Sequence, residues 1–499
     1  MMALTDLSRV FAPLSEAGVG LATAPFLALG VGVLLFLVCD IVTALKPLRP
    51  LVFFAALAVA FAGELAILAG AAERTEAART LFLGGTLRVD ATTALWGCIF
   101  LAGTLLAWVY SIGYYTQNRP FKPEHDALLL TAPAGMMLMV GAGDLIVFFI
   151  GLELLSIPLY ALAAFRRARA DSVEAGVKYF VLGSFSSALF LYGAALLYGA
   201  TGTVALEGDG GLLAFARQEG FYTPLSLAGI SFLAASLFFK VSVFPFHLWV
   251  PDVYEGSPTP VTALMATGTK AAAFGMLVRL APLLPPGAAP SVAWIAIATM
   301  AVGNLGALVQ PNLKRMLAYS GIAHAGTVLL VVAGARAGAT VESATLAALY
   351  YMGAYLFSAT GAFGVLSLLE SDGRRYLELE SLRGLARSRP GAAAALSLFM
   401  LSLGGIPTTG GFLGKWFVFS VLVVEADMIA IAVLGVLLSV VALAYYLRVI
   451  VVMYMQPAPA DQPVPRTMRP LTAGVATFLC SGFVLAMGVV PGWFLGLLD

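Results

Sequence analysis

The fold is decided by two apolar stretches that each place a lysine beside a break in a helix. Residues 236–260 read SLFFKVSVFPFHLWVPDVYEGSPTP and contain Lys240. Residues 397–420 read SLFMLSLGGIPTTGGFLGKWFVFS and contain Lys415. Both stretches are hydrophobic enough to lie in a membrane. Both also combine helix-breaking residues with a basic residue that membrane helices rarely carry.

The breaks come from prolines and glycines. Pro245 and Pro407 each remove a backbone hydrogen bond, so each is expected to break or kink its helix. His247 follows Lys240 by seven residues, about two helical turns, and lies on a similar face. Paired interrupted helices in two repeats are typical of the ion pathway of inverted-repeat transporters. The alternative is that proline and glycine are simply frequent in membrane helices.

The composition of the whole chain indicates a membrane protein. Of its 499 residues, 60% are hydrophobic and only 11% are charged, whereas soluble domains carry about 25% charged residues. This excludes a soluble enzyme, and a net charge of +1 gives no indication of nucleic-acid binding. The three cysteines are far apart, which excludes a disulfide framework, a paired-cysteine metal site and an iron–sulfur cluster held by this chain alone.

A helix needs about 20 apolar residues to cross a bilayer, and on that rule the sequence predicts fourteen spans. They cover residues 20–45, 50–71, 93–115, 126–141, 143–165, 174–200, 223–248, 258–283, 289–309, 316–335, 341–369, 391–422, 426–452 and 469–496. Two junctions between spans are so short that the count is open by one or two. We therefore predict an all-α polytopic membrane protein.

The two interrupted helices are the seventh and twelfth predicted spans, five spans apart. Spans four to eight and nine to thirteen therefore form two predicted repeats, and because five is odd the second repeat is inverted. The predicted divisions are residues 1–125 (spans one to three), 126–285 (first repeat), 286–455 (second repeat) and 456–499 (span fourteen).

Basic residues predict the orientation, because loops rich in lysine and arginine stay in the cytoplasm. Sixteen fall in odd-numbered loops: Lys46, Arg49, Arg119, Lys122, Arg166, Arg167, Arg169, Lys314, Arg315, Arg374, Arg375, Arg383, Arg387, Arg389, Arg466 and Arg469. Six fall in even-numbered loops: Arg74, Arg79, Arg88, Arg217, Arg279 and Arg336. This asymmetry predicts cytoplasmic odd loops and both termini outside.

The remaining charges lie where the bilayer should be. Four of the seven lysines fall within predicted spans: Lys178, Lys240, Lys270 and Lys415. Four acids lie in or beside spans: Asp40, Glu64, Asp144 and Glu153. A charge at mid-bilayer costs at least about 2.5–3.5 kcal/mol. Unlike arginine, a desolvated lysine can lose its proton, so these residues predict a chain of protonatable groups at membrane depth.

Each of these charged residues also has a purely structural interpretation. Lys178 follows Glu174 by four residues, which is a common surface pair at a helix start. Asp40 and Glu64 are compatible with polar groups at a helix end or a partner interface. The lysines deep in apolar runs, and Glu153 with them, are compatible with ion pairs that transport nothing.

The three histidines raise the same question. His247 and His324 are compatible with a relay, and equally with neutral histidines that are hydrogen-bonded inside a helix bundle. His125 lies at a junction between a loop and a helix, and we predict it at the surface.

Four longer motifs resemble one known family closely. They are EAGVKYFVLGSFSSA (residues 174–188), VPDVYEGSPTPVTALMATGTKAAAFGML (250–277), PNLKRMLAYSGIAHAG (311–326) and GIPTTGGFLGKW (405–416). Together they resemble subunit N of the proton-translocating NADH:quinone oxidoreductases, respiratory complex I. The resemblance runs from about span four to span thirteen. The outer spans match the family in number and character more than in amino-acid sequence.

The resemblance implies an antiporter-like membrane-arm subunit that carries protons and no electrons. It implies proton-relay roles for Glu153, Lys178, Lys240, Lys270, His324 and Lys415. His247 and Asp144 are secondary candidates. No cofactor or metal is expected on this chain, while NADH, FMN, iron–sulfur clusters and quinone are expected in partner subunits. The expected partners are an antiporter-like sister subunit, small membrane subunits and the lipid bilayer, in a bacterial inner membrane.

The expected mechanism is electrostatic. Glu153 and Lys240 would form an ion pair that keeps the lysine protonated. Loss of that pair would send the proton through His324 to Lys415. Two other functions stay open: a subunit of a multisubunit sodium/proton antiporter or membrane-bound hydrogenase, and a scaffold without transport of its own. The sequences GSPTPVTALMATGTK and AYSGIAHAG favour the complex I family over these two alternatives.

Overall fold

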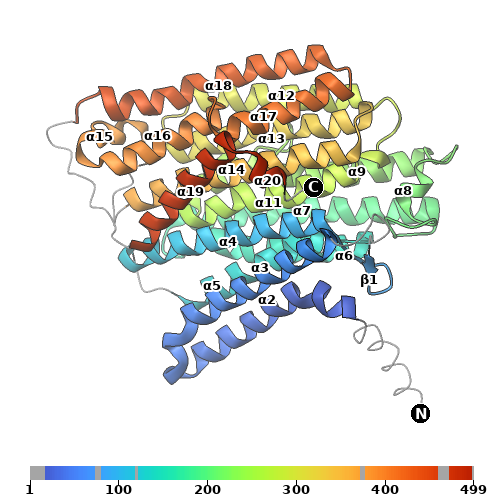
Figure 1. Cartoon of the computed structure of the whole chain (residues 1–499), viewed down its shortest axis with the longest axis horizontal. Coiled ribbons are helices and arrows are strands. Elements are labelled where there is room, and N and C mark those ends of the chain that lie inside the picture. Colours follow the sequence, from blue (N-terminus) through green and yellow to red (C-terminus); the bar gives the residue numbers. More distant parts are fainter. Residues whose placement is uncertain (1–16, 73–79, 119–121, 371–376, 459–470, 497–499) are drawn as a thin grey trace.

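A computed structural model describes residues 17–72, 80–118, 122–370, 377–458 and 471–496. This part of the chain is a bundle of long helices lying alongside one another (Figure 1). The long helices are α2 (Ala17–Ile41), α3 (Arg49–Ala72), α4 (Ala91–Asn118), α5 (Pro123–Val140), α6 (Leu145–Ala163), α7 (Ala170–Thr201), α9 (Pro224–Val241), α11 (Thr259–Arg279), α12 (Ala289–Leu308), α13 (Leu313–Ala337), α14 (Val341–Leu369), α16 (Pro390–Gly404), α17 (Gly410–Ser420), α18 (Ile429–Met455) and α19 (Leu471–Val489). Short elements are η2 (Thr43–Leu48), β1 (Thr80–Phe82), β2 (Leu87–Val89), α8 (Leu212–Phe215), α10 (Trp249–Gly256), η3 (Ala281–Leu283), η4 (Leu379–Leu382), α15 (Leu385–Ser388), the π-helix η5 (Val421–Glu425) and α20 (Gly492–Leu495).

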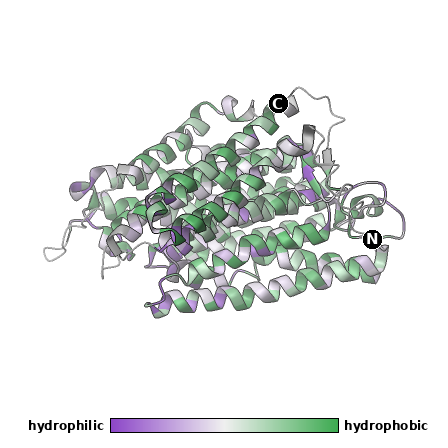
Figure 2. Cartoon of the chain, turned by 90° about the horizontal axis from the view of Figure 1, so that it is seen from below, coloured by the Kyte–Doolittle hydropathy of each residue, from purple (hydrophilic) through white to green (hydrophobic). Residues whose placement is uncertain are grey.

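The prediction of an all-helical membrane protein is confirmed. Twelve helices of the described residues are long and apolar enough to cross a membrane. Hydrophobic residues run along the lengths of the helices, and hydrophilic residues gather towards their ends (Figure 2). The two other predicted spans correspond to α5, whose first turn carries Glu124 and Asp126, and to the interrupted pair α16 and α17. A two-stranded antiparallel hairpin, β1 with β2, is the one sheet among the described residues.

The break in the seventh predicted span is present, and it begins three residues before the proline that predicted it. α9 ends at Val241, and Ser242 takes a left-handed conformation with φ of 68°. The chain then turns past Pro245, and α10 starts at Trp249.

The break in the twelfth predicted span is opened by a glycine. α16 ends at Gly404, and Gly405 has a φ of 83°, a conformation that costs glycine little. A short turn through Pro407 leads to α17, which starts at Gly410. Both predicted interruptions are therefore confirmed.

Most helix contacts within the first predicted repeat have a counterpart in the second. In the first, α5 contacts α6 and α11, α7 contacts α6 and α9, and α9 contacts α11. In the second, α12 contacts α13 and α18, α14 contacts α13 and α16, and α16 contacts α18. A methyl group on Gly135 of α5 would lie 2.3 Å from a backbone nitrogen of α6, and one on Gly303 of α12 would lie 2.4 Å from a backbone nitrogen of α13. This correspondence supports the division into repeats, whose exact bounds stay a prediction.

Three helices form the centre of the bundle. In the most hydrophobic part of α11 all residues are buried, and in those of α13 and α14 the buried share is 94% and 89%. In the most hydrophobic parts of α18 and α19, by contrast, only 28% of the residues are buried. The polar side chains in the middle of α11, α13 and α14, such as Lys270 and His324, are therefore enclosed by protein.

The predicted orientation depends partly on basic residues outside the described ranges. These are Arg74, Arg79, Arg119, Arg374, Arg375, Arg466 and Arg469. The orientation of both termini accordingly stays a prediction.

Candidate functional site

Lys240 lies in the last turn of α9, directly before the break, and its side chain is buried. Its Nζ donates hydrogen bonds to Ser156 Oγ at 2.7 Å and to Tyr160 OH at 3.2 Å, both on α6. The same ammonium lies 5.5 Å from the centre of the Tyr160 ring, within the range of a cation–π contact. Neutral hydroxyls and an aromatic face thus surround this lysine.

The expected ion pair between Glu153 and Lys240 is wrong for this structure. Glu153 lies on α6, one turn before Ser156, and accepts a hydrogen bond from the hydroxyl of Ser187 on α7. The lysine meets α6 a turn further along, at Ser156 and Tyr160. The sequence places Glu153 and Lys240 on two different helices but does not determine the level at which their side chains meet.

Lys270 is buried in the middle of α11. Its Nζ donates to the carbonyl oxygen of Gly321 on α13 at 2.6 Å. A methyl group at position 321 would lie 3.0 Å from both the Lys270 Nζ and the Tyr355 OH. The glycine therefore allows the lysine and the tyrosine hydroxyl to approach the α13 backbone closely.

His324 lies one turn beyond Gly321 on α13, with a tyrosine at each ring nitrogen. Its Nδ1 is 2.6 Å from the hydroxyl of Tyr351, and its Nε2 is 3.1 Å from the hydroxyl of Tyr446. A neutral imidazole donates through one nitrogen and accepts through the other. One tyrosine therefore donates to the ring while the other accepts from it. Tyr446 also shares a short hydrogen bond with Ser320.

Lys415 reaches back across the break in the twelfth span. It lies on α17, and its Nζ donates to the carbonyl oxygens of Leu403 at 3.2 Å and Gly404 at 2.9 Å. These carbonyls end α16 and have no partner within the helix, since the last four carbonyls of any helix lack one. The break thus supplies the acceptors that hold the buried ammonium.

Small cavities connect the histidine to this lysine. One is lined by His324, Lys415, Asn304 and Tyr445, among others. A second lies on the other side of His324 and extends towards Ser402 and Gly411. Each has some polar groups in a mostly apolar lining and room for about one water molecule. The structure therefore brings Lys270, His324 and Lys415 into one region.

Lys178 lies apart from this region. It pairs with Glu174 at 2.8 Å, as predicted for a surface pair, and with Asp252 of α10 at 2.6 Å. Arg315 of α13 contacts Asp252 at 2.8 Å and Glu255 at 2.9 Å. These ions connect α7, α10 and α13 at one end of the bundle.

The two secondary candidates, Asp144 and His247, lie beside helix ends. The Asp144 carboxylate caps α6 by accepting from the backbone amides of Ile146 and Val147. His247 is buried in the turn after α9, and its Nδ1 has no hydrogen-bond partner within the described part of the chain.

Of three other ionisable residues, Asp40 lies at a helix end, whereas Glu64 and His125 are buried. Asp40 pairs with Arg49 at 2.9 Å at the junction of α2 and α3, which fits the helix-end interpretation. Glu64 is buried against Gly97 of α4. The prediction of a surface position for His125 is wrong, because the first turn of α5 packs against α4 and leaves the ring fully buried.

Sequence reasoning missed a buried charge cluster at the ends of α13 and α14. Lys314, assigned to a loop, lies in the first turn of α13 and is fully buried. Its Nζ donates to the carbonyl oxygens of Ser257 at 2.6 Å and Glu255 at 3.0 Å. Asn312 caps this helix and was the available signal, since asparagine before an apolar run marks a helix start.

Glu370, one residue beyond α14, is the acid of this cluster. It accepts from Thr259 Oγ1 at 2.6 Å, from Arg166 at 3.3 Å and from Tyr114 OH at 3.3 Å. Burial alone would raise its pKa, but the nearby Lys314 and Arg166 outweigh burial and hold the pKa of this carboxyl below its usual range. The group is therefore ionised at neutral pH.

Comparisons with known proteins agree with this arrangement. Residues 142–442 match the family described as NADH:quinone oxidoreductase/Mrp antiporter, transmembrane. The chain is 42% identical over 416 residues to NADH-quinone oxidoreductase subunit N 2 of Roseiflexus castenholzii, covering 82% of each chain. It is 39% identical over 500 residues to subunit N of Salinibacter ruber, covering 98% of this chain and 94% of that one.

A solved structure supports the same assignment over nearly the whole length. A chain of respiratory complex I from Thermus thermophilus matches with a TM-score of 0.78 and 34% identity, covering 95% of this chain and 98% of that chain. The sequence relatives and the solved structure indicate the same family. The chain belongs to the subunit N family of the NADH-quinone oxidoreductases.

Proposed function

We propose that this chain translocates protons across the membrane as a non-redox subunit of respiratory complex I, coupled to quinone reduction elsewhere in the complex. The observation that carries the proposal is the enclosed series Lys270, His324 and Lys415, together with Lys240 at the first break. Buried ionisable residues inside a membrane bundle usually serve an ion or proton pathway. The subunit N relatives make complex I the assembly in which this happens.

Lysine suits this task because its proton can leave. Lys240, Lys270 and Lys415 each donate to neutral oxygens, and among the described residues no carboxylate forms an ion pair with any of them. A small change in the surrounding electrostatics therefore shifts the balance between the charged and the neutral form. Moving a proton against 100 mV takes about 2.3 kcal/mol, which is within reach of charge displacements in a medium of low dielectric constant.

The two tyrosines give His324 a way to pass a proton without moving. If Tyr351 donates to Nδ1, then Nε2 donates to Tyr446. In a transfer, Tyr351 would give its hydroxyl proton to Nδ1 and regain one from water in the adjoining cavity, while Nε2 would give its proton to Tyr446, which would release its own hydroxyl proton towards Ser320. The ring is then left as the other tautomer. Water in the adjoining cavities would extend the path to Lys415.

In this proposal Glu153 controls the charge state of Lys240 in the first repeat without contacting it at rest. Its carboxylate is held by Ser187, one turn away from the hydroxyls that hold Lys240. Release from Ser187 would let the carboxylate approach Lys240 and stabilise its charged form. Lys178 acts at the surface end, where its pairing with Asp252 connects α7 to the segment after the break.

The remaining assignments are proposals that rest on the family and on the sequence patterns described above. We propose that NADH, FMN, iron–sulfur clusters and quinone are bound by partner subunits. An antiporter-like sister subunit and small membrane subunits would be the neighbours, in a bacterial inner membrane with both termini on the periplasmic side. The divisions at residues 1–125, 126–285, 286–455 and 456–499 are proposed as the functional segments.

The direct test is Lys415→Ala in the assembled complex, reconstituted into liposomes. We expect proton transfer through this chain to fall by about 10²-fold, the effect of losing an acid–base group, and quinone-coupled pumping to fall with it. Pumping is measured as acidification per NADH oxidised. Lys122→Gln, at an exposed lysine, is the control. Wild-type pumping by Lys415→Ala would identify the chain as a scaffold instead.

A second expected result concerns the histidine. Tyr446→Phe removes one hydroxyl at His324 Nε2 and should slow pumping by about fivefold, which corresponds to one hydrogen bond of about 1 kcal/mol. Tyr454→Phe, at an exposed tyrosine of the same helix, should leave pumping unchanged. Equal rates in the two variants would argue against a tyrosine relay.

A further inference from the structure

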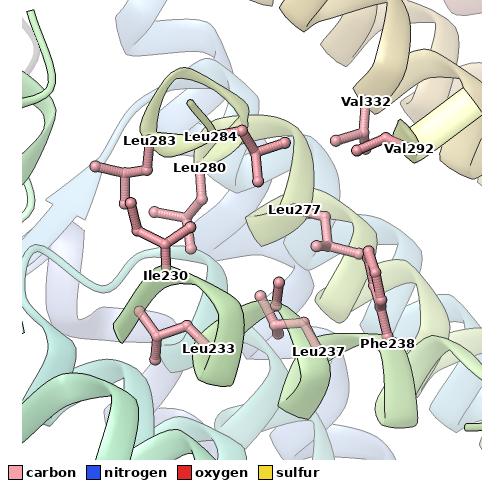
Figure 3. Close-up of a pocket in the computed structure, with 11 residues that line it drawn as sticks. Ile230, Leu233, Leu237, Phe238, Leu277, Leu280, Leu283, Leu284, Val292 and Val332 are labelled. Atoms are coloured by element: carbon pink, nitrogen blue, oxygen red, sulfur yellow. The ribbon is translucent and has the colours of Figure 1, made fainter. Parts of the chain in front are cut away.

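A narrow apolar cavity of about 40 Å³ opens between the two repeats. It is lined by Ile230, Leu233, Ala234, Leu237, Phe238, Leu277, Leu280, Leu283, Leu284, Val292 and Val332, and all the labelled side chains are hydrocarbon (Figure 3). Along α9 the lining extends from Ile230 to Phe238, a rise of about 12 Å. The cavity therefore has the apolar lining that a hydrocarbon chain requires.

A cation stands at one end of this cavity. Val332 lines the cavity from α13, and Arg336 follows it by four residues on the same helix face. The Arg336 Nε donates to the carbonyl oxygens of Leu284 at 2.8 Å and Pro285 at 3.2 Å. Leu284 itself belongs to the lining, so the guanidinium is fixed at the mouth of the cavity.

The charge of Arg336 has no acidic partner within the described part of the chain. Two other partly buried arginines near this end of the bundle do have one: Arg88 and Arg279 both contact Glu207, at 2.6 Å and 2.9 Å. Only Nε of Arg336 is engaged, by backbone carbonyls, so its terminal N–H groups are available to an anion. A guanidinium with free N–H groups binds phosphate well, because it offers paired donors.

The position of this cation matches the surface of a bilayer. Arg336 lies in the last turn of α13, and η3 and the start of α12 lie beside it. The Tyr222 hydroxyl donates to the same Leu284 carbonyl at 3.2 Å, and Trp294 of α12 is exposed. Tyrosine and tryptophan are enriched at the level of lipid headgroups.

We propose that this site binds an anionic glycerophospholipid. One acyl chain occupies the cavity along α9, and the phosphate receives hydrogen bonds from the free N–H groups of Arg336. The bilayer is the source, since the cavity is apolar throughout and its cation lies at headgroup depth. The acyl chain would contact Phe238, two residues before Lys240, and would therefore support the helix at its break.

The test uses the whole complex in liposomes that contain a phosphatidylglycerol with a diazirine in one acyl chain. After illumination, labelled peptides are quantified by mass spectrometry. We expect labelling of residues 230–238 in the wild type and a reduction of about five- to tenfold in Arg336→Gln, the range for one charge-assisted contact. Arg336→Lys should retain most of the labelling, and Ala234→Phe should remove it by filling the cavity.

A matched control is Arg448→Gln. Arg448 also binds a backbone carbonyl, that of Leu308 at 3.2 Å, but at the other end of α12 and beside none of the cavity-lining residues. This variant should label like the wild type, and assembly of the complex is checked for every variant. A diacylglycerol with the same diazirine chain should label residues 230–238 weakly. Equal labelling by diacylglycerol, or unchanged labelling in Arg336→Gln, would overturn the phosphate contact. Absence of label from α9 in the wild type would overturn the site.

Discussion

Replacing Lys240 by methionine should abolish proton transfer through the first half of this chain. Methionine keeps much of the lysine's length and apolar stem, so the packing against Tyr160 survives while the titratable group is lost. We expect transfer to fall by about 10²-fold or more, as for other acid–base groups. Lys240→Arg should impair transfer as well, because arginine keeps the charge and the hydrogen bonds to Ser156 and Tyr160 but cannot release its proton.

The pair of variants separates charge from proton release. Acidification per NADH oxidised is measured in liposomes, and electron transfer from NADH to an artificial acceptor reports on the intact redox partners. Lys122→Gln again serves as the exposed-lysine control. Wild-type pumping with Lys240→Arg would show that only the positive charge matters, and the relay through this lysine would have to be given up.

Glu370→Gln should destabilise the fold by about 3–5 kcal/mol, the cost of removing one partner from a buried ionic cluster. Glutamine has nearly the same size, so the packing is retained. Arg166, however, loses its carboxylate, and the fully buried Lys314 loses the nearest compensating charge. Thermal unfolding of the detergent-solubilised complex, or the amount of assembled complex, measures the effect.

An exposed acid provides the comparison for Glu370. Glu380 pairs with Arg383, but its side chain is 61% exposed, and such surface pairs contribute about 0–1 kcal/mol. Glu380→Gln should therefore be nearly neutral. A loss of stability in Glu380→Gln as large as that in Glu370→Gln would show that burial of the cluster is not the cause.

The pH dependence has a definite sign. Because the pKa of Glu370 is held below its usual value, its contribution to stability is complete above the unfolded pKa of about 4.3. It is lost only as the pH falls through the lower pKa of the folded state. The melting temperatures of wild type and Glu370→Gln should therefore differ at neutral pH and converge only in acid well below pH 4.3.

The sequence was sufficient to predict the helices, their two breaks and the burial of Lys240, Lys270 and Lys415, since all of these depend on local patterns. Apolar runs of about 20 residues identified the spans, and proline and glycine beside Lys240 and Lys415 identified the breaks, which the structure confirms within three residues. The lysines were found because a charge in an apolar run is costly, which makes it conspicuous in one chain.

What the sequence could not predict are the partners from distant parts of the chain. Tyr351 and Tyr446 are ordinary residues of apolar helices until the rotation of α14 and α18 directs them at His324. Arg166 and Glu370 are 204 residues apart. Helix rotation and depth depend on tertiary packing, so the sequence could not show that Lys240 meets Ser156 and Tyr160 rather than Glu153.

The attachment of Lys415 to the end of α16 has a mechanical consequence. The ammonium serves as the missing cap for two carbonyls of a different helix segment, so its charge contributes to holding α17 against α16. Linkage is reciprocal: if loss of the proton loosens the joint, then any force that pulls the two segments apart favours loss of the proton. A displacement transmitted along the membrane arm would in this way be converted into proton release at one residue.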